Sequence, residues 1–505
     1  MKTQFPIPLL ALASLAYAVP AQSTDESVQQ LETMVVTAHR IPTSDPVLPV
    51  TIVQYENHSP VGVEVLRRLP NFAISQSGSK GGLTQVRVRG SEANHTMVLI
   101  DGVEANDPAT GSEYNFAHFL PYASSHIEFL AGAQSAIWGS DALAGVINLS
   151  TEPVDRVRTL GVEAGSFDTR IATLQIADRR EHYYYNAAIL DYTTDGTNNA
   201  RVGGEKDGYD HLSWHLSGGW LGERWRLRST LRETKTESEF DPLSFTTFLP
   251  IDGDNDGEHD ELLASASLEV VSERWFQQLQ LSYLTTDNAA FANGTRLSTT
   301  EGERLKATYN GSFSFNPAAE LQLLLEYEEE RFDQSGAPSF FGDPNQAQKV
   351  DTTSAGLEYL GHTGNVDWSA SVRRDHNSDF DDATSYRLAV SYRLRETSRL
   401  WANVGTGIKN PSFVERFGFT PNTFIGNESL EPEVNQHVSV GLVQALDFSD
   451  VEAQFGVTLF HDRLEDEING FFFDPVLFAF TAVNRPGDST RKGVEATLSA
   501  RHGHN

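Results

Sequence analysis

The carboxylates of residues 252–258 are spaced for metal chemistry. The run reads Asp-Gly-Asp-Asn-Asp-Gly-Glu, which places carboxylates at positions 1, 3 and 5 and glycine at position 6, as in a calcium loop. Position 12 is Leu263, where an EF-hand needs a bidentate Glu, so the run is not an EF-hand. Oxygen ligands at this density favour Ca²⁺ over softer metals. Acids of an ordinary solvated loop are the alternative.

Patterns typical of catalysis are absent from the sequence. The chain has no Cys, which excludes thiolate metal sites and cysteine nucleophiles. Its 15 His residues lack the His-Glu-x-x-His spacing of a zinc site, and no Gly-x-Ser-x-Gly elbow indicates a hydrolase. The formal charge of −31 argues against nucleic-acid binding. None of these patterns therefore indicates an enzyme.

A second candidate site is the glycine-rich segment 77–82. Such turns present backbone N–H groups that can cradle a phosphate, but this one lacks the Gly-Lys-Ser/Thr order of a nucleotide-binding loop. A hairpin tip is the simpler reading. Two arginines that follow, Arg87 and Arg89, lie on one side of an expected strand, where they could face carboxylates of another domain.

The first 18 residues have the parts of a secretory signal. Met1-Lys2 precedes an apolar run over 7–16, which ends in the cleavage site Ala16-Tyr17-Ala18. No later run approaches the roughly 18 apolar residues of a transmembrane helix. The exported protein is then either soluble or a β-barrel, the other fold that satisfies every backbone group in lipid. Without disulfides, a large core or a closed sheet must stabilise it.

Three regions follow the signal. Residues 19–45 are polar and predict a flexible arm. Residues 46–152 predict a compact α/β domain, with a helix at 61–69 and with strands at 50–53, 86–89, 97–100, 127–130 and 146–149.

From residue 154 to 505 apolar and polar residues alternate with the period of a β-strand. In one example Val451, Phe455 and Leu459 alternate with Glu452 and Gln454. Aromatic residues flank several apolar faces, and short connections alternate with long acidic ones, as in outer-membrane barrels. The predicted fold is an all-β antiparallel transmembrane barrel with the N-terminal α/β domain inside it.

A set of motifs resembles one family, the TonB-dependent outer-membrane receptors. The plug domain of that family is matched by the segments 66–72, 88–90, 98–103, 127–130 and 136–149. Ahead of them, the arm contains a stretch similar to the family's TonB box, a strand that the inner-membrane protein TonB grips by β-augmentation. The box residues are Glu32, Thr33, Met34, Val35, Val36, Thr37 and Ala38.

Within the family the chain is most similar to cobalamin receptors. The resemblance lies in segments 73–83, 409–411, 417–419, 427–433 and 491–496. It implies active uptake of cobalamin, with a ferric siderophore receptor or a passive porin as alternatives. Haem is disfavoured because residues 413–430 contain no His. The plug residues implied to bind substrate are Ser77, Gly78, Ser79, Leu83, Asn106, Pro108, Ala109 and Thr110.

The resemblance also implies calcium ligands in the external loops. Asp241 and Asp252 match two aspartates that hold calcium in cobalamin receptors, while Asp195, Glu205 and Asp207 approximate the others. Glu205 stands where an Asp is expected. The expected setting is the outer membrane of a Gram-negative bacterium, with membrane lipid and TonB as partners and the protein as a monomer.

The expected strand count is lower than that of the family. Its barrels have about 22 strands. At about 20 residues per strand and connection, the residues after the plug supply only about 16 or 17. The sequence therefore predicts a barrel that is incomplete at its C-terminus by about five strands. Its edge near residues 486–500 should be unpaired or strained against the first strand.

Overall fold

The computed structural model describes His39, Ile41 and the chain from 47 to 502, except residues 55–61, 68–70, 120–121, 201, 245, 248, 341 and 449–450. The expected signal, most of the arm and the proposed TonB box lie outside the described residues. None of the described helices is long and apolar enough to cross a membrane.

The N-terminal part is an α/β domain built on a small mixed sheet. Its five strands run in the order β1 (Thr51–Gln54), β6 (His126–Ala131), β7 (Gly145–Ser150), β4 (Thr96–Ile100) and β5 (Val103–Glu104). The β4–β7 pair is parallel, and the other pairs are antiparallel. A separate hairpin joins β2 (Phe72–Gln76) to β3 (Thr84–Val88). Five of these strands match the expected ones to within two residues, because runs such as Val98–Ile100 supply the buried core, whereas β2 and β5 were not among the expected strands.

Five short helical segments connect these strands. They are α1 (Gly62–Leu66), α2 (Ser135–Trp138) and the 3₁₀ turns η1 (Ala93–His95), η2 (Pro108–Thr110) and η3 (Phe116–His118).

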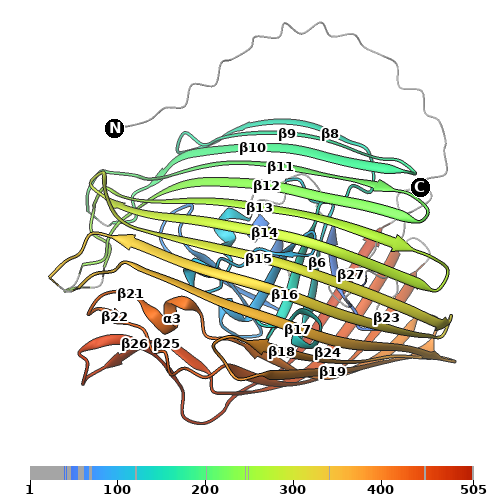
Figure 1. The fold of residues 1–505 in the computed structure, drawn as a ribbon. Helices are drawn as coiled ribbons and strands as arrows, with labels where there is room; N and C mark the ends of the chain where they lie inside the picture. The colour runs from blue at the N-terminus through green and yellow to red at the C-terminus, as the bar shows by residue number, and fades with distance from the viewer. Residues whose placement is uncertain are drawn as a thin grey trace, which may run out of the picture. The chain divides into compact units, whose positions relative to one another are not determined.

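Most of the remaining described chain forms one antiparallel sheet of 16 strands, which meander in sequence order around the N-terminal domain (Figure 1). The strands are β8 (Val157–Ala164), β9 (Arg170–Arg179), β10 (Tyr183–Thr197), β11 (Asp207–Leu221), β12 (Trp225–Phe240), β13 (Asn255–Val271), β14 (Trp275–Ala292), β15 (Thr295–Asn316), β16 (Ala319–Gly336), β17 (Gln346–Thr363), β18 (Val366–Asn377), β19 (Ala383–Arg395), β20 (Ser398–Lys409), β23 (Glu433–Phe448), β24 (Val451–Glu465) and β27 (Ser489–His502).

The two faces of this sheet have the polarity of a barrel in lipid. Along β11, the polar residues His211, Ser213 and His215 are buried, whereas Leu212 and Leu216 are 37% and 49% exposed. Such an inverted pattern would expose apolar surface to water in a soluble sandwich, but it suits a polar lumen and a lipid-facing exterior. Exposed tryptophans beside the chain reversals, such as Trp220, match the aromatic girdle of such barrels.

Connections at the two ends of the sheet differ in length. At one end they contain only two or three residues, as between Arg179 and Tyr183 or between Asn316 and Ala319. At the other end, residues 241–254, 410–432 and 466–488 form long connections. The last two carry helix α3 (Phe413–Phe417) and a small sheet of β21 (Gly418–Thr420), β22 (Phe424–Ile425), β25 (Ile468–Asp474) and β26 (Ala479–Asn484).

The first and last strands of the large sheet each have one neighbour. Within the described residues β8 pairs only with β9, and β27 pairs only with β24. The count of 16 described strands lies within the expected 16 or 17, and the expected incompleteness of the barrel stays a prediction.

Candidate ligand-binding site

A cavity of about 540 Å³ lies between the N-terminal domain and the wall, at the end with long connections. The domain contributes the loop after β2 and the segment from Ala105 to His118. The wall contributes residues of β12, β13, β14 and β15 and of the connection 241–254. A cavity of this size between two structural units is a usual setting for a ligand.

Four of the eight residues implied to bind substrate line this cavity, namely Ser77, Gly78, Leu83 and Thr110. Ser79 lies beside it and donates its hydroxyl to the carbonyl of Glu239 (3.2 Å). The glycine-rich tip is held close to the wall. A Cβ on Gly81 would lie 2.2 Å from the ring of Tyr209, so only glycine fits at this close approach.

The structure does not bring Asn106, Pro108 and Ala109 into the cavity lining. The Asn106 side chain is fully buried, accepts a hydrogen bond from the Val98 amide (2.8 Å) and donates to two backbone carbonyls. Pro108 begins turn η2, and Ala109 packs in a cluster with Phe332 of the wall. These side chains are buried in contacts with the plug and the wall, and their expected role in ligand binding stays a prediction.

The cavity lining is acidic. Among the described residues that line it there is no Lys and no Arg. Its carboxylates are Asp107, Glu113, Asp241, Glu258 and Glu261. A ligand with a net negative charge would meet repulsion on every side, whereas a neutral or cationic ligand would not.

A carboxylate cluster adjoins the cavity. Ligand oxygens of Glu205, Asp241 and Asp252 lie within 4.8 Å of one another. Burial and the neighbouring carboxylates, Asp207 first among them, raise the pKa of Glu205 to about 7. One oxygen of Glu205 and one of Asp207 are buried without a hydrogen-bond partner. Carboxylate oxygens are the kind of ligand that hard cations prefer.

Two connections supply this cluster: 198–206 contributes Glu205, and 241–254 contributes Asp241 and Asp252. From the run 252–258 only Asp252 takes part, and the run from Asn255 onward is extended in β13. Asp195, a fifth candidate ligand, lies apart and pairs with Lys206 at 3.0 Å, with both side chains about half exposed. Sequence reasoning missed Glu239, whose carboxylate accepts a hydrogen bond from the Gly208 amide (2.8 Å) and raises the pKa of Glu205.

The cavity also contains two histidines that no spacing in the sequence indicated. The rings of His118 and His259 stack with centroids 4.8 Å apart and planes 9° apart. Both residues line the cavity.

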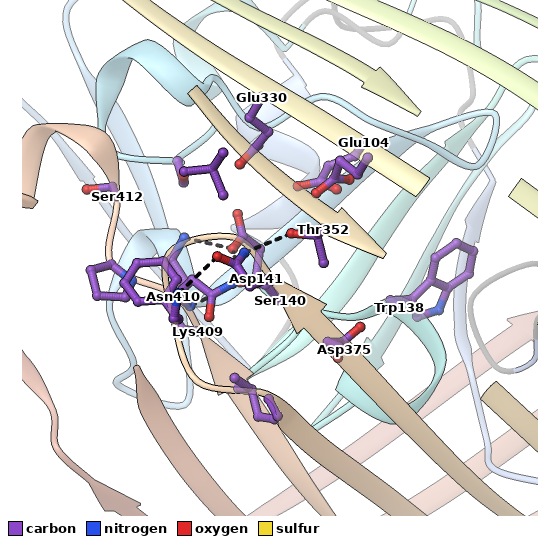
Figure 2. Close-up of a pocket in the computed structure, with 18 of the residues that line it drawn as sticks. Glu104, Trp138, Ser140, Asp141, Glu330, Thr352, Asp375, Lys409, Asn410 and Ser412 are labelled. Carbon is purple, nitrogen blue, oxygen red and sulfur yellow. Dashed lines mark hydrogen bonds and ion pairs between the residues drawn. The ribbon is translucent and has the colours of Figure 1, made fainter. Parts of the chain in front are cut away.

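Ion pairs and hydrogen bonds join the N-terminal domain to the wall. In the interior shown in Figure 2, Lys409 Nζ lies 2.7 Å from Asp141 Oδ1, with both side chains less than a tenth exposed. Arg89 forms a bidentate pair with Glu495 (2.6 and 2.7 Å), as expected for a residue that faces a wall carboxylate. The same expectation was wrong for Arg87, which bonds within its own hairpin to Ser75 and Gln85.

Two family descriptions match the chain. "TonB dependent receptor-like, beta-barrel" matches residues 134–503, and "TonB-dependent Receptor Plug Domain" matches residues 61–146. Relatives include proteins named vitamin B12 transporter BtuB. The one from Vibrio vulnificus strain YJ016 is 24% identical over 91% of this chain and 75% of its own length. The one from Photobacterium profundum is 25% identical over 87% and 72%.

Solved structures share the fold. The ferric enterobactin receptor PfeA of Pseudomonas aeruginosa has a TM-score of 0.73 at 16% identity, covering 92% of this chain and 79% of that one. The copper transporter OprC has a TM-score of 0.70 at 15% identity, covering 90% and 76%. The α/β domain is thus a plug and the 16-stranded sheet a barrel wall, and the chain belongs to the TonB-dependent receptors of the Gram-negative outer membrane.

Proposed function

We propose that this receptor takes up cobalamin across the outer membrane and draws energy from TonB through residues 32–38. The observation that carries the proposal is the cavity between the plug tips and the wall, whose described lining holds five carboxylates and no Lys or Arg. Cobalamin is a corrinoid rich in neutral amide groups, which such a lining can bind. Ferric catecholates are anionic, and this lining offers them no cation. The names of the vitamin B12 transporters support the same choice.

Purified receptor is expected to bind cyanocobalamin and not ferric enterobactin. Thr110, at the plug tip, is exposed to the cavity. A Thr110→Trp variant fills that space and should weaken cyanocobalamin binding at least about tenfold, which corresponds to about 1.4 kcal/mol. Equilibrium dialysis measures both ligands. The matched control is Thr363→Trp, an exposed position at the end of β17 away from the cavity. If the receptor bound ferric enterobactin and not cyanocobalamin, the result would contradict cobalamin as the cargo and indicate a siderophore.

We also propose that Ca²⁺ binds the cluster of Glu205, Asp241 and Asp252, with Asp207 beside it. The support is the convergence of hard oxygen ligands and the two buried, unpartnered oxygens. Gly203 lets its loop approach closely, since a Cβ there would lie 2.0 Å from the Asp252 carboxylate. A bound cation would join segments 195–210 and 238–262 above the cavity and thereby favour ligand binding.

Calorimetry is expected to show calcium uptake by the wild type and none by the Asp241→Ala, Asp252→Ala double variant. Wild-type receptor should bind cyanocobalamin more tightly with Ca²⁺ than with a chelator, and the Asp241→Ala, Asp252→Ala variant should not. The control is the Asp343→Ala, Asp379→Ala double variant, which removes two acids from other connections at the same end of the sheet. It should take up calcium as the wild type does. Equal calcium uptake by the Asp241, Asp252 variant would leave the cluster as ordinary solvated acids.

A further inference from the structure

His259 is held in the cavity by a relay of hydrogen bonds. The Asp107 carboxylate, 6% exposed, accepts hydrogen bonds at Oδ1 from the Ala109 amide (2.8 Å) and the Thr286 hydroxyl (2.6 Å). Its other oxygen accepts from Asn288 Nδ2 (2.9 Å). The amide oxygen of Asn288 lies 2.7 Å from Nδ1 of His259. The relay thus runs from the plug, through one wall strand, to the next.

This relay sets the position of the proton on the imidazole. Because Asn288 uses its NH₂ group toward Asp107, its oxygen is the atom that faces His259, and an amide oxygen only accepts. Nδ1 of His259 must therefore carry the proton. In the neutral ring, Nε2 then holds a lone pair. No residue that the structure describes makes a hydrogen bond to this Nε2, and His259 lines the cavity.

The stacked partner His118 has no such free lone pair. Its Nε2 lies 3.0 Å from Nδ2 of Asn115, whose oxygen accepts from the amides of Thr84 and Ala117, so Asn115 donates to the ring. Its Nδ1 lies 3.3 Å from the Tyr209 hydroxyl. Burial lowers the pKa of His118 well below the usual value, so an uncharged ring backs His259. The cavity therefore offers one oriented imidazole.

A single imidazole can bind only a metal whose other coordination positions are already filled. Among the described residues, the only group of three or more side chains placed to hold a bare ion is the carboxylate cluster, which excludes His259. One ligand cannot retain a free transition-metal ion, but it can bind a metal that brings its other ligands with it. Such a metal complex must have an exchangeable axial position, as planar macrocyclic complexes do.

We propose that Nε2 of His259 is an axial ligand to the metal of the cargo, a planar macrocyclic complex with an exchangeable axial position. This rests on the proposed function, since cobalamin is one such complex. In the binding step the lone pair of Nε2 forms a bond to the metal, and the axial water leaves with its own electron pair. The metal keeps its oxidation state, and no proton is transferred.

The test uses three probes on the purified, detergent-solubilised receptor. Aquocobalamin has an exchangeable axial water, cyanocobalamin has a tightly held cyanide in its place, and haemin is a planar iron complex from a different source. Wild-type receptor is expected to shift the visible spectrum of bound aquocobalamin toward that of its imidazole complex and to leave the spectrum of cyanocobalamin unshifted. His259→Ala should lose the shift. The control His376→Ala, an exposed histidine that pairs with Asp382 outside the cavity, should keep it.

The outcomes separate the inference from the proposed function. Cyanocobalamin binding without a spectral shift of aquocobalamin, or an equal shift in His259→Ala, overturns axial ligation and leaves cobalamin uptake standing. A His259-dependent shift of haemin, with neither cobalamin bound, supports axial ligation and overturns cobalamin as the cargo.

Discussion

Cells that depend on this receptor are expected to lose cobalamin uptake, down to the level of a strain without TonB, when Val35 is replaced by proline. Proline removes a backbone N–H and fixes φ, so residues 32–38 can no longer add as a strand to a partner's sheet. Binding at the outer face should persist, because the substitution changes none of the described residues that line the cavity. Accumulation of labelled cyanocobalamin measures uptake, and surface binding is measured separately on energy-depleted cells.

The matched control places proline elsewhere in the arm. Val28→Pro makes the same substitution upstream of the box and should leave uptake intact. Undiminished uptake by Val35→Pro would contradict the assignment of residues 32–38, whereas loss of uptake in both variants would indicate a general requirement of the arm.

The second large effect is expected at the ion pair of Lys409 with Asp141. Replacing Lys409 by Met leaves the Asp141 carboxylate, 7% exposed, without its cation at 2.7 Å. Breaking a buried pair in this way costs about 3–5 kcal/mol. Asp141 follows helix α2, so the loss should appear as faster hydrogen exchange of the α2 amides in Ser135–Trp138.

Two further variants make this measurement specific. Lys409→Met combined with Asp141→Asn removes the uncompensated charge and should recover much of the lost protection. Lys349→Met breaks a pair with Glu329 (2.9 Å) in which the Lys is 46% exposed, and such pairs contribute about 1 kcal/mol or less. If Lys409→Met and Lys349→Met lowered the exchange protection of the α2 amides equally, the buried pair would contribute no more to stability than the exposed one.

The fold could be predicted because its signals are local. Strand period, turn residues and the contrast between short and long connections all act over a few residues, as the buried and exposed positions of β11 show. The expected helix at 61–69 is shorter in the described residues, where α1 spans Gly62–Leu66.

The site was predictable only in part, because its residues are assembled across long distances in the chain. Asn106 resembled a ligand-binding polar residue, but its buried amide satisfies backbone groups that the sequence does not identify. Asp195 was separated from the acidic cluster by a neighbouring Lys206. His118 and His259 stack although 141 positions separate them, and no spacing rule could connect them. Glu239 lies two residues before Asp241, and this spacing at the end of a strand could have found it.

The polar contact between plug and wall determines how the plug responds to a mechanical load. Pairs such as Arg89 with Glu495 and His95 with Glu433 join the two parts. When a pulling force separates the two members of a pair, water hydrates each of them. Neither charge then stays buried without a partner, as it would after the substitution of one member. An apolar interface would instead resist separation until its whole area became exposed to water at once. These polar pairs can therefore separate one after another, with water taking the place of each lost partner, rather than all at once.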